Sequence, residues 1–178
     1  MNRTTLIFCF VLFITGPGST VAHGQRAPRV PYVDKGACPF ECCTYREWTV
    51  EMPTFARRDM SDASPVIFRM NKGEKVKGLT GTVITTRAGI VRVLKNTKLG
   101  NVRLTRGDNL YLLTYLGEGM SKIWYKGRIF EDQPQDETLF KQIRRPTDIW
   151  WVKVRNRRGR IGWSREPDNF GNKDKCGR

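Results

Sequence analysis

The sequence predicts an all-β protein made of small barrels. Apolar residues alternate with a period of two, the segments are short and rich in β-branched and aromatic residues, and no window shows a long helical stripe. Turn residues separate the expected strands, which are 45–50, 65–70, 74–80, 82–87, 90–96, 109–117, 121–130, 149–155 and 160–163. Many short strands at close spacing are typical of barrels and sandwiches.

Residues 1–24 are typical of a secretory signal peptide. Arg3 supplies a positive charge, and the apolar run 6–14 that follows is too short to span a bilayer. Small residues then allow cleavage after Ala22 or after Gly24. The alternative is an uncleaved membrane anchor. We therefore expect a secreted or periplasmic protein.

A leader rich in proline and glycine, 25–43, should end in the cysteine cluster CPFECC. Cys38, Cys42, Cys43 and Cys176 remain after the signal, and an even number in an oxidising compartment predicts two disulfides. A bond between the adjacent Cys42 and Cys43 would be strained. Both other connectivities join Cys176 to the cluster, so we expect a disulfide clamp at the termini.

Metal binding and catalysis are not expected. The cysteine spacing does not form a zinc knuckle, and the one histidine, His23, lies in the cleavage region. Cleavage after Gly24 leaves no histidine and cleavage after Ala22 leaves only the near-terminal His23, so the mature chain lacks the usual base for a serine or cysteine nucleophile. The sequence therefore predicts a protein that is not an enzyme and has no cofactor.

An internal repeat relates residues 68–80 to residues 102–114. Both copies are a strand, a turn in the order basic–Gly–acidic, and a second strand, and glycine permits the positive φ that such a turn needs. The identical positions are Arg69/Arg103, Gly73/Gly107, Leu79/Leu113 and Thr80/Thr114. The repeat predicts two related β-units at 44–97 and 98–170, followed by a tail, 171–178.

A hairpin should close the second unit at 150–163. Alternation places Trp150 with Val152 and Val154 on one face, and Trp151 with Lys153 and Arg155 on the other. Asn156 and Gly159 occupy the first and fourth positions of a turn, where type I turns favour them.

The pattern of an aromatic residue, two alternating valines, a glycine turn and a final Gly-Trp resembles the C-terminal half of bacterial SH3-like (SH3b) domains. The turns Lys72-Gly73-Glu74 and Arg106-Gly107-Asp108 are similar to another turn of that family. The resemblance implies tandem or elaborated five-stranded barrels that act as non-catalytic targeting modules. The first unit lacks the Gly-Trp ending, and the second carries an extra segment, 117–148, which we expect to be an inserted loop.

Candidate ligand-binding residues are exposed aromatic and basic side chains. We expect a groove lined by Tyr111, Trp124, Tyr125, Trp151 and Trp163, because aromatic rings with polar tips suit half-wet surfaces. Arg155 and Arg158 at the hairpin tip could bind a phosphate or carboxylate. The alternative is that each ring packs in the core and that the arginines are solvated turn residues.

The chain is strongly basic, with a net charge of +15. Removal of residues 1–24 would leave 31 basic and 17 acidic residues, a charge of +14. Such a chain is attracted to anionic surfaces. We expect an exported binding module for a cell-wall polymer, another anionic envelope component or a peptide. A structural subunit that contacts an envelope protein is the alternative; peripheral membrane contact remains open, and nucleic-acid binding is less favoured.

Overall fold

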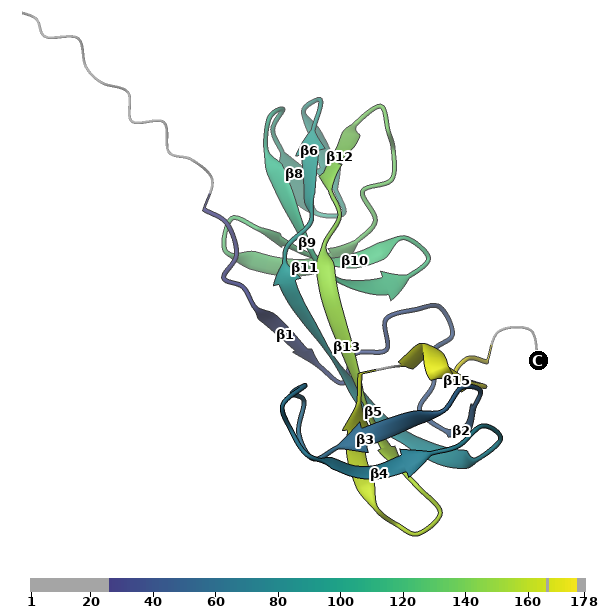
Figure 1. Ribbon diagram of the computed structural model, residues 1–178. Helices are drawn as coiled ribbons and strands as arrows, with labels where there is room; N and C mark the ends of the chain where they lie inside the picture. Colours follow the sequence, from purple (N-terminus) through teal and green to yellow (C-terminus); the bar gives the residue numbers. More distant parts are fainter. Residues whose placement is uncertain (1–25, 166, 176–178) are drawn as a thin grey trace, which may run out of the picture.

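The computed structural model describes residues 26–165 and 167–175, and this part of the chain is all-β (Figure 1). Its strands are β1 (Tyr32–Lys35), β2 (Glu47–Val50), β3 (Thr54–Arg57), β4 (Val66–Met70), β5 (Lys75–Arg87), β6 (Ile90–Val93), β7 (Thr97–Leu99), β8 (Val102–Leu104), β9 (Asn109–Gly117), β10 (Met120–Tyr125), β11 (Arg128–Asp132), β12 (Phe140–Arg144), β13 (Thr147–Arg155), β14 (Ile161–Ser164) and β15 (Phe170–Gly171). A short 3-10 helix, η1 (Pro167–Asn169), precedes β15. The described residues include no helix long and apolar enough to cross a membrane. The expected signal peptide and Cys176 lie outside them.

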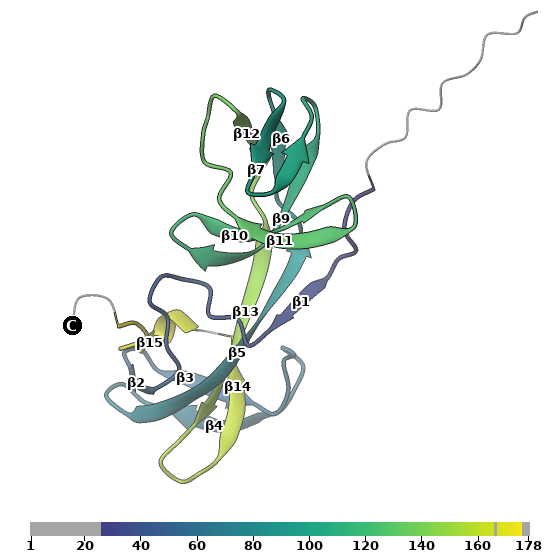
Figure 2. The same cartoon turned by 180° about the vertical axis from the view of Figure 1, so that it is seen from behind.

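The strands are divided between two lobes, which we name by their order in the sequence: the strands of the inner lobe come between those of the outer lobe. The outer lobe contains β2 to β5 and β13 to β15, joined in the order β15-β2-β5-β13-β14-β3-β4, and β1 pairs with the far part of β5. The inner lobe contains β6 to β12, with a sheet in the order β11-β10-β9-β6-β12 and the separate hairpin β7-β8. The long strands β5 and β13 run side by side from the outer lobe toward the inner lobe (Figures 1 and 2). The inner lobe is therefore an insertion between two paired strands of the outer lobe.

Both lobes repeat one pattern of strand pairing. The pairs β2-β5, β5-β13, β13-β14, β3-β4 and β15-β2 of the outer lobe correspond to β6-β9, β9-β10, β10-β11, β7-β8 and β12-β6 of the inner lobe. The repeated turns carry the same hydrogen bonds. The Gly73 amide donates to the Val50 carbonyl, and the Gly107 amide donates to the Val93 carbonyl, at 2.8 and 2.9 Å. Both glycines have positive φ, 85° and 92°.

Each lobe has its own apolar core. The outer core gathers Trp48, Val152, Val154 and Phe170 with other buried residues, and Trp150 packs beside it. The inner core is formed by nine buried residues: Val91, Val93, Leu99, Leu104, Leu110, Leu112, Ile123, Tyr125 and Phe140. The predicted faces of the 150–163 hairpin are thus confirmed, since both valines are fully buried.

Two segments carry more regular structure than the sequence suggested. The extra segment 117–148, expected to be an inserted loop apart from the predicted strand 121–130, contains β10 and β11 at that predicted strand and, in addition, β12. The leader 25–43 contains β1, which pairs with β5. The sheets also cross the expected boundary between residues 97 and 98, because β13 and β14 join the strands of the first unit. Periodicity shows that a segment is a strand, but it does not show which strand pairs with it.

The cysteine cluster packs against the end of the chain. Cys38 and Cys43 form a disulfide. Cys42 is disulfide-bonded as well, and Cys176, which the sequence predicts to pair with this cluster, lies outside the described residues. Cys43 forms a β-bridge with Asp174, and the Lys175 amide donates to the Cys42 carbonyl at 3.0 Å. These contacts hold the described end of the chain beside the cluster.

Candidate functional site

The five expected aromatic residues do not form one groove. Tyr111 on β9 and Trp124 on β10 are directly opposite neighbours on adjacent strands, on one face of the sheet. Their ring centroids lie 5.6 Å apart in an edge-to-face arrangement. Tyr111 is buried, whereas Trp124 is partly exposed. Both rings lie in a small cluster with Leu113 and Tyr32. Trp124 is therefore the exposed part of an aromatic face on the inner lobe.

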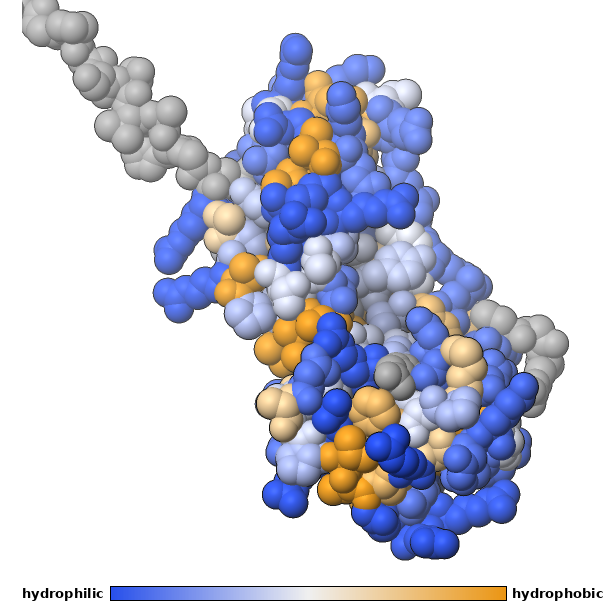
Figure 3. Space-filling view, in the orientation of Figure 1, coloured by the Kyte–Doolittle hydropathy of each residue, from blue (hydrophilic) through white to orange (hydrophobic). Residues whose placement is uncertain are grey.

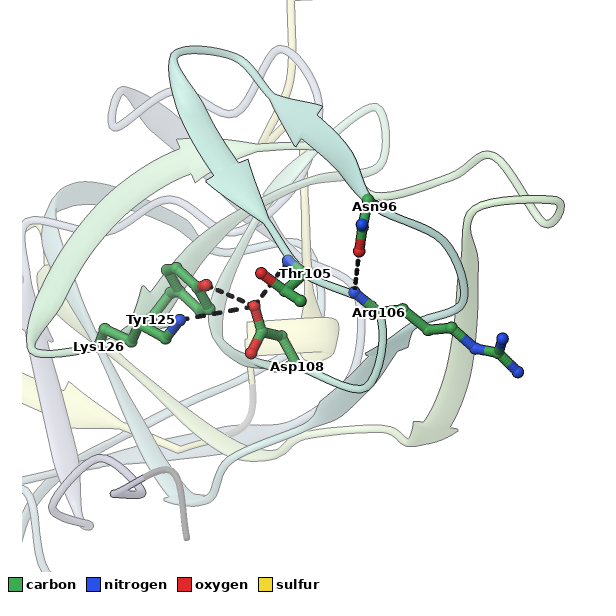
Figure 4. Close-up of polar contacts among 6 residues, drawn as sticks. All are labelled: Asn96, Thr105, Arg106, Asp108, Tyr125 and Lys126. Atoms are coloured by element: carbon green, nitrogen blue, oxygen red, sulfur yellow. Dashed lines mark hydrogen bonds and ion pairs between the residues drawn. The ribbon is translucent and has the colours of Figure 1, made fainter. Parts of the chain in front are cut away.

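Tyr125 lies on the opposite face, in the inner core. Its hydroxyl donates a hydrogen bond of 2.6 Å to Asp108 (Figure 4). The Thr105 amide donates to the same carboxylate oxygen at 2.8 Å, and the Lys126 ammonium lies 3.7 Å away. This cluster fixes the glycine turn that the sequence repeat contains, and the neighbouring Arg106 amide donates to Asn96 at 2.8 Å.

The Asp108 cluster shifts the titration of its members. Partial burial alone would raise the pKa of Asp108, but the Tyr125 hydroxyl, the Thr105 amide and the Lys126 charge together hold this pKa below its usual range. Burial and the hydrogen bond to Asp108 raise the pKa of Tyr125. Asp108 is thus an ionised structural anchor at neutral pH.

Trp151 and Trp163 occupy different surroundings in the outer part of the molecule. Trp151 is buried, with 3% of its surface exposed, so it is not an open ligand platform. Trp163 is partly exposed on β14, between its strand neighbours Lys153 and Arg57. The Lys153 ammonium lies 5.4 Å from the Trp163 ring centre, a cation–π contact within the protein.

Trp150, on the core side of β13, forms the centre of an aromatic contact with the leader. Phe40 packs edge-on against it, with ring centroids 5.6 Å apart. The Tyr45 hydroxyl donates to the Ala37 carbonyl. Burial raises the pKa of Tyr45 to about 12, with Trp150 acting in the opposite direction. A Cβ on Gly81 would lie 2.7 Å from the Ala37 oxygen, so only glycine fits between the strand and this contact.

The turn after β13 has the expected geometry. The Gly159 amide donates to the Asn156 carbonyl at 3.0 Å, and Gly159 has a φ of 76°. The Asn156 side-chain oxygen accepts from the amides of Arg158 and Arg160, at 3.1 and 3.0 Å. The asparagine thus holds the tip in one conformation, and it presents the Arg157 and Arg158 side chains to solvent.

Arg155 lies opposite a lysine that sequence reasoning did not select. Arg155 on β13 pairs with Lys77 on β5, and both side chains are exposed. Like charges directly opposite on one face of a sheet are destabilising. Glu47 follows Lys77 in the same row. Within the described residues, neither Lys77 nor Arg155 takes part in an ion pair.

Two hollows extend this cationic row over the end of the outer lobe. One has a volume of about 750 Å³ and the other about 490 Å³, and Lys75, Asn156 and Arg157 line both. We call this surface the basic face. Its cations, in addition to Arg46, are Arg69, Lys75, Lys77, Arg155, Arg157, Arg158 and Arg160. Hydrophilic side chains predominate along the lower edge of the molecule, and an apolar patch lies beside them (Figure 3).

Among the residues that the structure describes, the cations of the basic face form no ion pair. Two acids, Glu47 and Glu74, line the same hollows, and Glu74 accepts a hydrogen bond from Asn71 at 3.0 Å. The sequence identified Arg155 and Arg158 but missed Lys75 and Lys77. The alternation Lys75-Val76-Lys77 in the sequence places both lysines on one face of their strand. Their position beside the arginines follows only from the register of β5 against β13.

The described residues contain no cluster of three or more side chains suited to hold a metal ion. Comparison with protein-family models, with curated proteins and with solved structures gives no match for this chain.

Proposed function

We propose that the protein is an exported, non-catalytic module that binds an anionic polymer of the cell envelope through its basic face. The observation that carries this proposal is the pair of opposed cations Lys77 and Arg155, which forms no ion pair among the described residues and lines the first of two adjoining hollows rich in basic side chains. Repulsion among these cations reduces the stability of the free protein. The binding of anionic groups relieves this repulsion. The Cys38–Cys43 disulfide supports an oxidising compartment.

The proposal includes an SH3-like origin for both lobes. Its support is the strand pairing that the two lobes repeat, together with the matching hydrogen bonds of their glycine turns. In this proposal the second barrel is inserted into the first rather than following it. The basic face then lies at the turn between β13 and β14 of the outer barrel.

Binding to the basic face should involve several anionic groups at once. The two hollows meet at Lys75, Asn156 and Arg157, so one continuous strip of cations crosses the hairpin tip. Arginine binds phosphate and carboxylate groups through two parallel hydrogen bonds. A polymer with repeated anionic groups can contact the whole strip, whereas a single small anion contacts one hollow. We therefore expect polymer binding that is strong at low salt and weak at high salt.

The test is co-sedimentation of the full protein with purified cell walls, and with walls stripped of anionic polymer. The Lys77→Ala/Arg155→Ala variant should bind about thirty-fold more weakly, since each of the two cations near an anionic surface contributes about 1 kcal/mol. A matched control is Lys98→Ala/Arg103→Ala, which removes another exposed pair of opposed cations, on the hairpin β7-β8. Equal losses in the two variants, or unchanged binding to stripped walls, would contradict the proposal.

A further inference from the structure

β11 is an edge strand with an open outer side. It pairs with β10, and no other strand in the described part of the chain pairs with it. Its counterpart in the outer lobe, β14, is paired on both sides, because Trp163 bridges to Arg57 on β3. The inner-lobe counterpart of β3 is β7, which pairs with β8 alone. The outer lobe is therefore closed between β14 and β3, whereas the inner lobe is open between the corresponding strands β11 and β7. We call this unpaired junction of the inner lobe the open seam.

Hollows flank both faces of β11. The first, of about 930 Å³, lies on the face that carries Trp124, and it is lined by Leu113 and by Pro28 of the leader. The second, of about 550 Å³, lies at the open seam and is lined by Val102 and Phe130. Ile129 of β11 lines both hollows, and it is 47% exposed.

The alternation of β11 matches the two hollows. Ile129 lies opposite Trp124, on the outer face of the sheet. Arg128 and Phe130 lie opposite Tyr125 and Ile123, which belong to the inner core. A strand added to β11 would direct its side chains alternately to these two faces. An extended peptide can therefore fill both hollows while its backbone pairs with the free edge.

The rims of both hollows are basic. The first hollow, on the Trp124 face, is lined by Arg26, Arg29 and Lys126. The second hollow, at the open seam, is lined by Arg103, Arg128 and again Lys126. Asp108 also lines the first hollow, but its carboxylate accepts hydrogen bonds from the Tyr125 hydroxyl and the Thr105 amide. The chemistry thus favours a partner with apolar side chains and with carboxylates near them.

We propose that β11 is a docking edge for an extended acidic–apolar peptide segment of a partner protein, which binds by strand addition. Main-chain hydrogen bonds supply affinity in this mode of recognition, and the pockets for alternate side chains supply specificity. A polysaccharide has no regular row of amides to pair with the edge, so this site is distinct from the basic face and does not depend on it.

The test uses the full chain with its disulfides intact and a fluorescein-labelled peptide of about seven residues, Asp-Asp-Val-Phe-Val-Asp-Asp. Fluorescence polarisation should show binding below about 1 mM. Ile129→Asp should weaken it about ten-fold or more, because it places a carboxylate among the carboxylates of the peptide. The matched control is Ile143→Asp, on the other edge strand of the same sheet, where Ile143 is 52% exposed. That change should have little effect.

Two altered peptides separate strand addition from other modes of binding. N-methylation of the three central amides should abolish binding, because it removes the backbone donors. Replacement of the four aspartates by lysines should weaken binding strongly. Equal binding of either altered peptide, equal loss in Ile129→Asp and Ile143→Asp, or no binding at about 1 mM would overturn the proposal.

A measurement on the wild-type protein covers the case in which Ile129→Asp does not fold. Amide hydrogen exchange with and without the peptide should show new protection at residues 128–132, and little change at residues 140–144 of β12. The proposal fails if the peptide leaves the exchange of β11 unchanged.

Discussion

Tyr45 shows how a single buried hydroxyl makes stability depend on pH. Its pKa is raised to about 12 by burial, from an ordinary value of 10.0, because the phenolate is poorly solvated there. The folded state thus retains the proton more strongly than the unfolded state. This contribution to stability is fully present below pH 10, and it is lost as the pH rises toward 12.

Replacement of Tyr45 by Phe should test this. At pH 9 the variant should be less stable by about 1 kcal/mol, because the hydroxyl no longer donates to the Ala37 carbonyl. The difference in stability between wild type and variant should shrink as the pH rises above 10. Only the wild type loses stability through this group there, because its folded state has to keep the Tyr45 hydroxyl protonated. Urea unfolding at pH 9, 10 and 11 would measure it. A difference that stays constant over this range would show that Tyr45 titrates normally.

Tyr125 should make stability depend on pH at the acidic end, through Asp108. The pKa of Asp108 is lowered in the fold, so its contribution is present at neutral pH and is lost as the pH falls through its folded value. We expect Tyr125→Phe to cost about 1 kcal/mol at pH 7 and less at acidic pH, where the carboxyl is protonated. The control is Tyr115→Phe, whose hydroxyl is in an exposed contact with Gly119. Denaturant unfolding at both pH values would decide, and a pH-independent loss would be contrary to expectation.

At the scale of the elements, β1 is joined to the inner lobe by an ion pair. β1 forms backbone pairs with β5, and Asp34 of β1 accepts a hydrogen bond from Lys122 of β10 at 2.8 Å. Asp34 is almost completely buried, and burial raises the cost of a charge that has lost its partner. The leader is thus an integral strand that ties the shared strand β5 to β10.

Replacement of Lys122 by Met should therefore destabilise the protein by about 2–3 kcal/mol, because it leaves the Asp34 carboxylate without its cation. Asp34→Asn in addition should recover part of the loss. Lys98→Met, at an exposed site on β7, should change stability little. Thermal unfolding of the four proteins would measure these effects. A loss for Lys122→Met no larger than that for Lys98→Met would contradict a structural role of the pair.

The strands and turns could be predicted from sequence much better than their partners. Alternation correctly identified the buried face of β13, and Asn156 and Gly159 correctly marked its turn, because both signals are local. The pairing of β13 with β5 spans the whole inner lobe, and no local pattern encodes it. Lys77 illustrates the consequence for the site: it became a candidate only through its register opposite Arg155. Trp151 illustrates the reverse, since alternation gave its face but not what covers it.

At the scale of the whole molecule, insertion of one lobe into the other explains how two surfaces can act independently. The basic face lies at the β13-β14 turn of the outer lobe, and the β11 edge belongs to the inner lobe. β5 and β13 both pass between the lobes, as a pair of hydrogen-bonded strands rather than a single linker. Under the two proposals made above, a ligand at one end leaves the other end accessible, so that the protein would hold a partner protein at an anionic polymer.

The termini of the outer lobe provide the last prediction. Cys38 pairs with Cys43, which leaves Cys42 for the predicted bond with Cys176. This bond would close a loop of more than a hundred residues, and its loss should cost about 2–5 kcal/mol, mainly through the greater freedom of the unfolded chain. The Cys42→Ser/Cys176→Ser variant should show this loss in denaturant unfolding.

Mapping of disulfides under non-reducing conditions gives the direct measurement. Proteolysis and mass spectrometry should recover one peptide from the CPFECC cluster joined to the C-terminal peptide that contains Cys176. The Cys38→Ser/Cys43→Ser variant is the control, and it should lose less stability because its loop is short. A free thiol at Cys176 in the oxidised protein would contradict the clamp. The β15-β2 pairing and the contacts of residues 173–175 with residues 42–46 would then link the two ends of the outer lobe without a disulfide.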